Sequence, residues 1–163
     1  MTSIPGWRVS RLSITHPDAA PLVEEVQGEY VARYGGRDDT PLDPSYFEAP
    51  AGAFFVGYLH DRPVATGAWR RRGDVVVGST SATAEIKRMY VAPGARGLGL
   101  ARAMLAHLEQ TARQEGAEAI VLETGLRQPE AIRLYTSSGY TPIDGFGFYK
   151  DAPLSRCFGK AVG

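Results

Sequence analysis

The sequence is poor in the side chains that form disulfides or hold metals. Cys157 is the one cysteine among 163 residues, so neither an internal disulfide nor a multi-cysteine cluster can form. A reducing compartment is the natural setting for such a chain. The three histidines, His16, His60 and His107, lack the spacing of metal ligands. We therefore expect no metal.

An excess of charge and long apolar runs are also absent. Lys and Arg together number 18, as do Asp and Glu, whereas proteins built to hold nucleic acid normally carry a basic excess. No apolar stretch approaches the roughly 20 residues that span a bilayer, and residues 1–6 lack the pattern of a signal peptide. We expect a soluble, cytoplasmic protein without a nucleic-acid or membrane partner; the sequence leaves open whether it forms a homodimer.

What the sequence does contain is an ordinary globular composition, with 44% hydrophobic and 22% charged residues. Its length suits one domain with its own core, which we place at residues 1–163.

Periodicity in the first half predicts a strand, a helix and a hairpin. Residues 7–14 alternate as in a half-buried strand. Asp18 is placed to cap a helix that Gly35-Gly36 ends. Residues 35–50 are rich in Gly, Asp and Pro and predict a loop with one helical turn at 45–48. Strands at 53–59 and 63–70 flank a tight turn, and 71–83 is ambiguous between a short strand at 75–77 and a loop.

The second half predicts a strand at 85–91, a helix at 98–112, a strand at 119–123 and a helix beginning at Pro129. The apolar positions 101, 104, 105, 108 and 112 mark one face of the longer helix. Two strands follow Tyr140, the second at 156–162. The order β-α-β-β-β-α-β-α-β-β is typical of an α/β domain with a mixed sheet.

The loop between the 85–91 strand and the next helix is built to bind phosphate. It contains Gly94, Gly97 and Gly99, which allow a ligand close to the backbone, and it opens into a helix N-terminus with free N–H groups. Arg96 and Arg102 add positive charge. A P-loop is excluded because no Lys-Ser or Lys-Thr follows the glycines, and a dinucleotide fold would place the loop near the first strand of a parallel unit.

The remaining pattern is [RQ]-x-x-G-x-[GA], which Arg96-Gly97-Leu98-Gly99-Leu100-Ala101 satisfies. It resembles the pyrophosphate-binding motif of the GNAT superfamily of N-acetyltransferases. The segments 120–125, 128–135 and 138–140 resemble the second half of the same signature, so the likeness covers residues 84–140. Gln128 stands where many relatives carry Asn, and Ala101 replaces the commoner last Gly.

This resemblance implies an α/β fold, a single GNAT-like domain whose mixed, mostly antiparallel central sheet is flanked by helices. It implies direct acetyl transfer from acetyl-CoA to a primary amine in a ternary complex, with a small molecule as the favoured acceptor. The residues that it assigns to acetyl-CoA are Met89, Tyr90, Val91, Arg96, Gly97, Leu98, Gly99, Leu100, Ala101, Arg102 and Gln128.

The reaction needs a base and an acid. An alkyl ammonium with a pKa near ~10.4 is almost fully protonated at neutral pH, and the departing thiolate needs a proton. The resemblance makes Glu85, at the start of its strand, the candidate base and Tyr135 the candidate acid. The alternatives are a solvated edge glutamate paired with Lys87 or Arg88, and a core tyrosine with a structural hydroxyl.

Several other residues are expected to have no catalytic role. His107 is expected to be an exposed helix residue, and His16 and His60 solvated turn residues. Cys157 is expected to be a small strand residue rather than an acetyl relay, and residues 70–72 a solvated, arginine-rich strand end that could instead reach the nucleotide.

Two alternative functions stay open: acetylation of a protein N-terminus or lysine, and a catalytically silent acetyl-CoA sensor. The acidic side chains Asp38, Asp39, Asp43 and Glu48 could attract a cationic amine. Arg33 and Arg37 lie close by in sequence, however, and a solvated acidic loop is the simpler interpretation.

Overall fold

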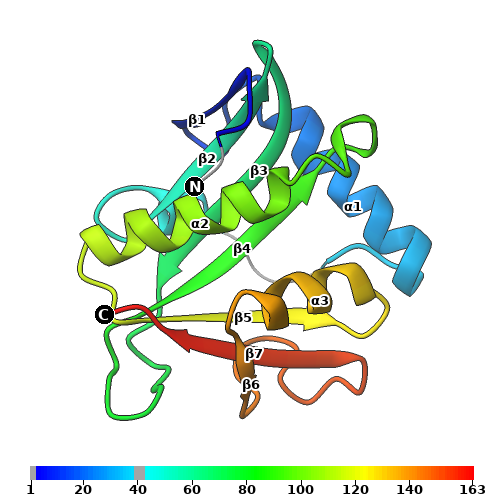
Figure 1. The fold of residues 1–163 in the computed structure, drawn as a ribbon. Helices are drawn as coiled ribbons and strands as arrows, with labels where there is room; N and C mark the ends of the chain where they lie inside the picture. The colour runs from blue at the N-terminus through cyan, green and yellow to red at the C-terminus, as the bar shows by residue number, and fades with distance from the viewer. Residues whose placement is uncertain (1–2, 39–42) are drawn as a thin grey trace.

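The computed structural model of the chain describes residues 3–38 and 43–163 (Figure 1). Within them, seven strands and three α-helices follow one another in the predicted order. The strands are β1 (Trp7–Arg11), β2 (Gly52–Leu59), β3 (Arg62–Arg71), β4 (Thr83–Val91), β5 (Ala119–Gly125), β6 (Thr141–Ile143) and β7 (Ser155–Ala161). The helices are α1 (Ala20–Tyr34), α2 (Leu100–Gln114) and α3 (Pro129–Ser137), with short 3-10 turns η1 (Pro44–Phe47) and η2 (Pro93–Ala95).

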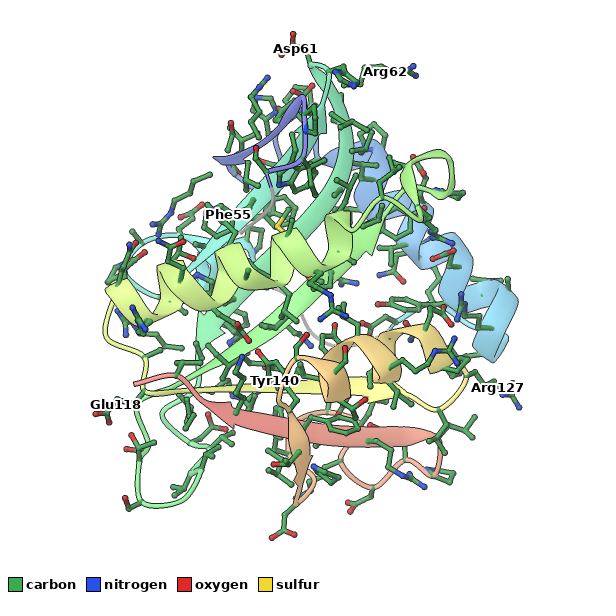
Figure 2. All side chains as sticks on the ribbon, viewed as in Figure 1. Phe55, Asp61, Arg62, Glu118, Arg127 and Tyr140 are labelled. Atoms are coloured by element: carbon green, nitrogen blue, oxygen red, sulfur yellow. The ribbon has the colours of Figure 1, made fainter. Side chains whose placement is uncertain are left out.

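The strands form one mixed sheet in the order β1-β2-β3-β4-β5-β7-β6. Every neighbouring pair is antiparallel except β4 and β5, which are parallel and joined by α2 as a crossover. The predicted hairpin joins β2 to β3 through His60 and Asp61, whose φ angles are 49° and 64°. Two consecutive positive φ angles match a type I′ turn, the turn that suits the twist of a hairpin. Asp61 and Arg62 extend from this tip, away from the helices (Figure 2). The prediction of a mixed, mostly antiparallel α/β domain is confirmed.

Each face of the sheet packs against its own helices, because neighbouring residues of a strand point to opposite sides. Phe55, Trp69 and Ile86 form one core with α2 and α3, which lie in front of the sheet in Figure 1. Phe54 and Val56 form a second core with α1 on the other face. The predicted face of α2 is correct at Met104, Leu105, Leu108 and Ala112, which are buried; Leu100 is buried with them and Ala101 is half-buried.

Two local predictions need correction, and one open alternative is resolved. β1 ends at Arg11, because residues 12–19 turn to enter α1. Asp18 does not cap α1; its carboxylate instead accepts a hydrogen bond from the Tyr58 hydroxyl at 2.5 Å. Residues 75–77 contribute one isolated bridge, Val77 with Thr80, and no strand. No helix within the described ranges 3–38 and 43–163 is long and apolar enough to cross a membrane.

Candidate active site

The centre of the site is a break in the sheet where β4 and β5 separate. Their pairing comprises three residue pairs and ends at Glu85 with Val121. Further along β4 an extra residue stands opposite Gly67 of β3, and Arg88 takes a φ of 56°. Such a bulge bends a strand and re-aims its side chains. Met89, Tyr90 and Val91 therefore have no strand neighbour on the β5 side, and a ligand can lie in the gap.

Three cavities lead through this gap. The first, the loop cavity, has a volume of about 310 Å³ and is lined by the residues from β4, the glycine loop and α3, together with Glu29 of α1. The second, the junction cavity, has a volume of about 100 Å³ and lies between the separated strands. The third, the tyrosine cavity, has a volume of about 340 Å³ and opens beside the C-terminal end of α1. Gln128 lines all three, so they adjoin one another.

The glycine loop has the features of an anion cradle. Gly97 and Gly99 both have a φ of 83°, a conformation that favours glycine. A Cβ on Gly97 would meet no protein atom within 4 Å, and one on Gly99 would meet only Ile4 Cδ1 at 4.0 Å. The space beside them is therefore open, and Gly99 supplies no side-chain cap to the first N–H groups of α2. Free N–H groups and the dipole of a helix N-terminus suit a pyrophosphate.

The structure places most of the predicted acetyl-CoA residues around the loop cavity. Met89, Tyr90, Val91, Arg96, Gly97, Gly99, Leu100, Ala101 and Gln128 all line it. Leu98 is exposed and lies outside the lining. Arg102 also lies outside, because its guanidinium donates to the Ser137 and Ser138 hydroxyls of α3. The Arg96 guanidinium donates to Glu29 at 2.7 Å and to the Val91 carbonyl at 2.8 Å.

Tyr135 lies where the loop cavity meets the junction cavity and lines both. Its ring packs edge-to-face against Tyr140, and burial raises the pKa of its hydroxyl. Among the described residues, no hydrogen-bond partner holds that hydroxyl. The alternative of a hydroxyl with a structural role is therefore not supported, and the O–H remains available to a ligand.

Glu123 lies on the opposite side of the junction from Tyr135. It lines the junction cavity and the tyrosine cavity, and the thiol of Cys157 lies 3.9 Å from its carboxylate. Burial raises the pKa of Glu123, an effect that Lys87 partly opposes and Glu85 reinforces. A carboxylate whose pKa moves toward neutrality is suited to accept a proton.

Glu85 lies nearby in a different environment. It is 3% exposed, so it is not a solvated edge residue. Arg72 donates to one carboxylate oxygen at 2.7 Å, and Lys87 lies 3.6 Å from the other. The predicted pairing with Lys87 is present, but the principal partner is Arg72, whose other donors bind Asp74. The predicted solvated strand end is thus wrong for Arg72, whose side chain is 11% exposed.

Replacing Arg72 by Met is expected to lower the free energy of unfolding by about 3–5 kcal/mol, because Glu85 would keep a buried charge without its hydrogen-bonded partner, with Lys87 at 3.6 Å as the remaining cation. Urea denaturation measures the loss. The control Arg113→Met, at an exposed site of α2, should stay within about 0.5 kcal/mol of the wild type. A loss below about 1 kcal/mol would show that Arg72 does not stabilise the Glu85 carboxylate.

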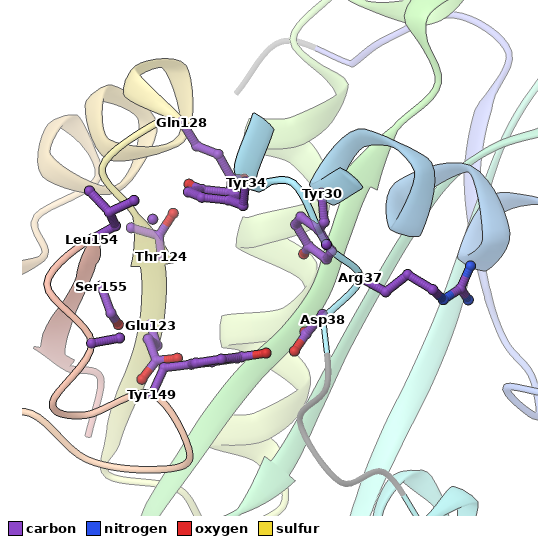
Figure 3. Close-up of a pocket in the computed structure, with 13 residues that line it drawn as sticks. Tyr30, Tyr34, Arg37, Asp38, Glu123, Thr124, Gln128, Tyr149, Leu154 and Ser155 are labelled. Atoms are coloured by element: carbon purple, nitrogen blue, oxygen red, sulfur yellow. The ribbon is translucent and has the colours of Figure 1, made fainter. Parts of the chain in front are cut away.

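The tyrosine cavity lies between the C-terminal end of α1 and the segment before β7 (Figure 3). Its walls include the rings of Tyr30, Tyr34 and Tyr149, with Leu154 at one side. Burial raises the pKa of Tyr30 to about 12, so its hydroxyl stays neutral. Tyr34 is held by Gln128, which donates to its hydroxyl at 3.3 Å. The cavity therefore has aromatic walls, and the carboxylates of Asp38 and Glu123 also line it.

The histidines and Cys157, which were predicted to have no catalytic role, differ in their burial. His107 is half-buried rather than exposed, because its ring packs edge-to-face on Phe55, and burial lowers its pKa. His60 is exposed as predicted, and His16 is half-buried and accepts a hydrogen bond from the Asp18 N–H. Cys157 is buried, and burial raises the pKa of its thiol, which disfavours a thiolate relay.

The acidic loop is only partly described. Asp38 is half-buried and forms an ion pair with Arg88 at 3.5 Å. Asp43 and Glu48 are exposed, as a solvated loop requires, and Asp39 lies outside the described residues. Within residues 3–38 and 43–163, no group of three or more His, Cys, Asp or Glu side chains could hold a metal ion.

Sequence reasoning missed Glu123, Arg72 and the three tyrosines of the tyrosine cavity. Glu123 ends an apolar run, AIVLE, and that position was the one available signal that its carboxylate reaches the end of a buried strand. The role of Arg72 and the meeting of Tyr30 with Tyr149 depend on contacts between distant segments, for which the sequence offered no signal.

Comparisons with known proteins agree with this geometry. The Acetyltransferase (GNAT) family profile matches residues 20–140. An IAA acetyltransferase of Azospirillum brasilense is 30% identical over 159 residues, which are 98% of this chain and 100% of that protein. An N-acetyltransferase of Escherichia coli is 31% identical over 134 residues, 79% of this chain and 78% of its own length.

Solved structures share the fold over nearly the whole chain. A Klebsiella pneumoniae protein assigned to the acyl-CoA N-acyltransferases superposes with a TM-score of 0.76 and 26% identity, covering 96% of this chain and 98% of its own. A Salmonella typhimurium protein solved with acetyl-CoA has a TM-score of 0.70 and 18% identity, covering 97% and 95%. The cradle, the separated strands and these matches lead to one conclusion: the chain belongs to the GNAT family of acetyltransferases.

Proposed function

We propose that this enzyme transfers an acetyl group from acetyl-CoA to a primary amine of a small molecule, by direct attack in a ternary complex. The observation that carries the proposal is that three cavities adjoin one another where β4 and β5 separate. The loop cavity on one side suits a pyrophosphate and its extended arm, and the tyrosine cavity on the other suits a small acceptor. The two meet at the junction cavity, where the amine can reach the thioester.

The residues divide between two tasks. The glycine loop and the N-terminus of α2 would bind the pyrophosphate, and the free edge of β4 from Met89 to Val91 would bind the arm that carries the acetyl group. Arg96 would add positive charge, although it now shares its guanidinium with Glu29. Gln128 would separate the two ligands, because it lines every cavity.

Proton transfer would use both sides of the junction. Tyr135 would donate a proton to the departing thiolate, because its hydroxyl is protonated and has no hydrogen-bond partner among the described residues. Glu123 would accept the proton of the amine, directly or through water, because it lines the junction cavity and Glu85 does not. Glu85 stays the base predicted from the sequence, and its engagement by Arg72 ranks it behind Glu123.

A small-molecule acceptor is favoured by two observations. The tyrosine cavity, at about 340 Å³, has the size of small-ligand sites. The Azospirillum relative, which matches over its whole length, is named as an IAA acetyltransferase. The test is a panel of small amines and peptides with CoA release as the readout. CoA release only with peptides would contradict a small acceptor. If none of the amines or peptides in the panel stimulated CoA release, the result would favour a sensor.

Acetyl-CoA at about 100 times its Kd is expected to raise the Tm by about 5–10 °C, because it binds the folded chain alone. Gly99→Val should abolish that shift, since a branched side chain would fill the space beside the cradle. Thermal denaturation with and without acetyl-CoA measures both.

Gly78→Val is the matched control. Gly78 also has a positive φ, 61°, and open space around it, and it lines none of the cavities described above. Without ligand, Gly78→Val should change the Tm about as much as Gly99→Val does. With acetyl-CoA, the Tm of Gly78→Val should still increase as in the wild type. A normal shift in folded Gly99→Val would contradict the cradle.

A further inference from the structure

A fourth cavity lies next to Glu123 on the same face of the sheet as the tyrosine cavity. This arginine cavity has a volume of about 390 Å³, and its charged lining is Arg70, Arg72, Asp74, Glu85, Lys87 and Glu123. The segment between β6 and β7 borders both cavities, through Gly147 and Phe148 on one side and through Tyr149 and Leu154 on the other. Glu123 thus stands between a cavity with aromatic walls and a cavity with cations.

Strand register explains why these charges gather. Arg70 of β3 is opposite Glu85 of β4, and Glu85 is opposite Val121 of β5. Side chains two residues apart on a strand share a face, so Lys87 and Glu123 point the same way as this row. Arg70 and Glu85 therefore lie side by side, and Lys87 and Glu123 lie on the same face, one step further along β4 and β5.

Among these cations, Arg70 is the one without a carboxylate of its own. Arg72 is held by both Asp74 and Glu85, and Lys87 lies 3.6 Å from Glu85. Arg70 forms no ion pair or hydrogen bond with any described residue, although its charge contributes to the lowered pKa of Asp74. Its guanidinium instead lies over the ring of Tyr46, 4.1 Å from the centroid.

Contact with the ring holds the guanidinium without using its N–H groups as hydrogen-bond donors. Those N–H groups form the fork that matches a carboxylate. Lys87, which lines both the arginine cavity and the junction cavity, can add a second positive charge close to Glu123.

We propose that the acceptor is an amine that also carries a carboxylate, with Arg70 as the specificity-determining residue that binds this carboxylate. The aromatic or large apolar part of the same molecule lies in the tyrosine cavity. An α-amino acid with such a side chain fits, because its amine, carboxylate and side chain leave one carbon atom in three directions. The amine then faces Glu123 and the other two groups enter the flanking cavities. This inference rests on the proposed acetyl transfer to a small amine.

The matched probes are L-phenylalanine and phenethylamine, which differ by the carboxylate, with L-alanine to test the apolar part. At saturating acetyl-CoA the wild type should favour L-phenylalanine over phenethylamine by about 10–100-fold in kcat/KM, the usual effect of a hydrogen-bonded charge pair. L-Alanine should be the poorer of the two amino acids.

Arg70→Gln should remove the preference by raising the KM for L-phenylalanine, while kcat/KM for phenethylamine stays near the wild-type value. Comparing the two enzymes cancels the difference in basicity between the two amines. Arg113→Gln, at an exposed site, should keep the preference. A wild type that does not prefer L-phenylalanine, or an Arg70→Gln enzyme that still does, would overturn the assignment.

Equilibrium binding separates this inference from the proposed function. Calorimetry with CoA present measures binding of L-phenylalanine and phenethylamine without turnover. If no amine releases CoA, acetyl transfer to a small amine fails, whereas weaker binding of L-phenylalanine to Arg70→Gln than to wild type still supports the carboxylate site. Equal binding to both proteins, or none to either, overturns it.

Discussion

Tyr135→Phe is expected to lower kcat by about 10²–10⁴, the range for loss of a positioned acid or base. The substitution removes the O–H and keeps the ring, which packs against Tyr140. Because no described residue hydrogen-bonds that hydroxyl, its loss should leave neither a broken contact nor a buried unsatisfied group. The measurement is steady-state CoA release with a true acceptor, since hydrolysis without one reports attack by water.

The control for Tyr135→Phe is its Tm, measured with and without acetyl-CoA. The Tm of Tyr135→Phe and its increase on adding acetyl-CoA should match those of the wild type, because the ring that borders the loop cavity is retained. Tyr140→Phe is the contrasting variant: its hydroxyl donates to Glu109 at 2.6 Å, so it should lower stability and leave kcat largely unchanged. Unchanged kcat in Tyr135→Phe would remove its role as the acid.

The order of strands and helices could be predicted because it depends on local patterns. The apolar spacing of α2 and the glycines after α1 and α3 act within a few residues, and each appears in the structure near its predicted position. The glycine loop was found for the same reason. Its chemistry needs only consecutive residues, Arg96 to Ala101, at the start of a helix.

The parts that could not be predicted depend on contacts between distant residues. Arg96 shares its guanidinium with Glu29, 67 positions earlier in the chain. For Glu85, the alternative of a solvated edge residue stayed open, because its burial depends on the pairing of β5 with β4 and on the contact with Arg72. No pattern in the neighbouring residues predicts either contact.

Glu123 shows the same limit at the reaction centre. In sequence it is the polar end of a buried strand, and such a residue is usually solvated. It becomes a candidate base only because β4 and β5 separate after Glu85, which opens the junction cavity beside its carboxylate. The separation is followed along β4 by a bulge at Arg88, and no residue pattern in β4 predicts the positive φ of that residue.

Glu123→Gln is expected to lower kcat/KM by about 10²–10⁴ near neutral pH, because the amide cannot accept the proton of the ammonium. The loss should shrink as the pH approaches the pKa of the amine, near ~10.4, where solvent supplies neutral acceptor. In the wild type, burial raises the pKa of Glu123, so activity should fall as the pH drops through that raised pKa. The pH profile of kcat/KM measures both effects, and an unchanged response to acetyl-CoA confirms the fold.

Glu85→Gln distinguishes the two glutamates. Glu85 is held by Arg72 and Lys87 and lies outside the lining of the junction cavity. Its substitution should lower stability and reduce kcat/KM by a similar factor at every pH, through displacement of its partners. If Glu85→Gln instead shows the loss that high pH rescues, while Glu123→Gln is only scaled down, then Glu85 is the base and Glu123 positions the acceptor. The two pH profiles, recorded with the same amine, decide between these assignments.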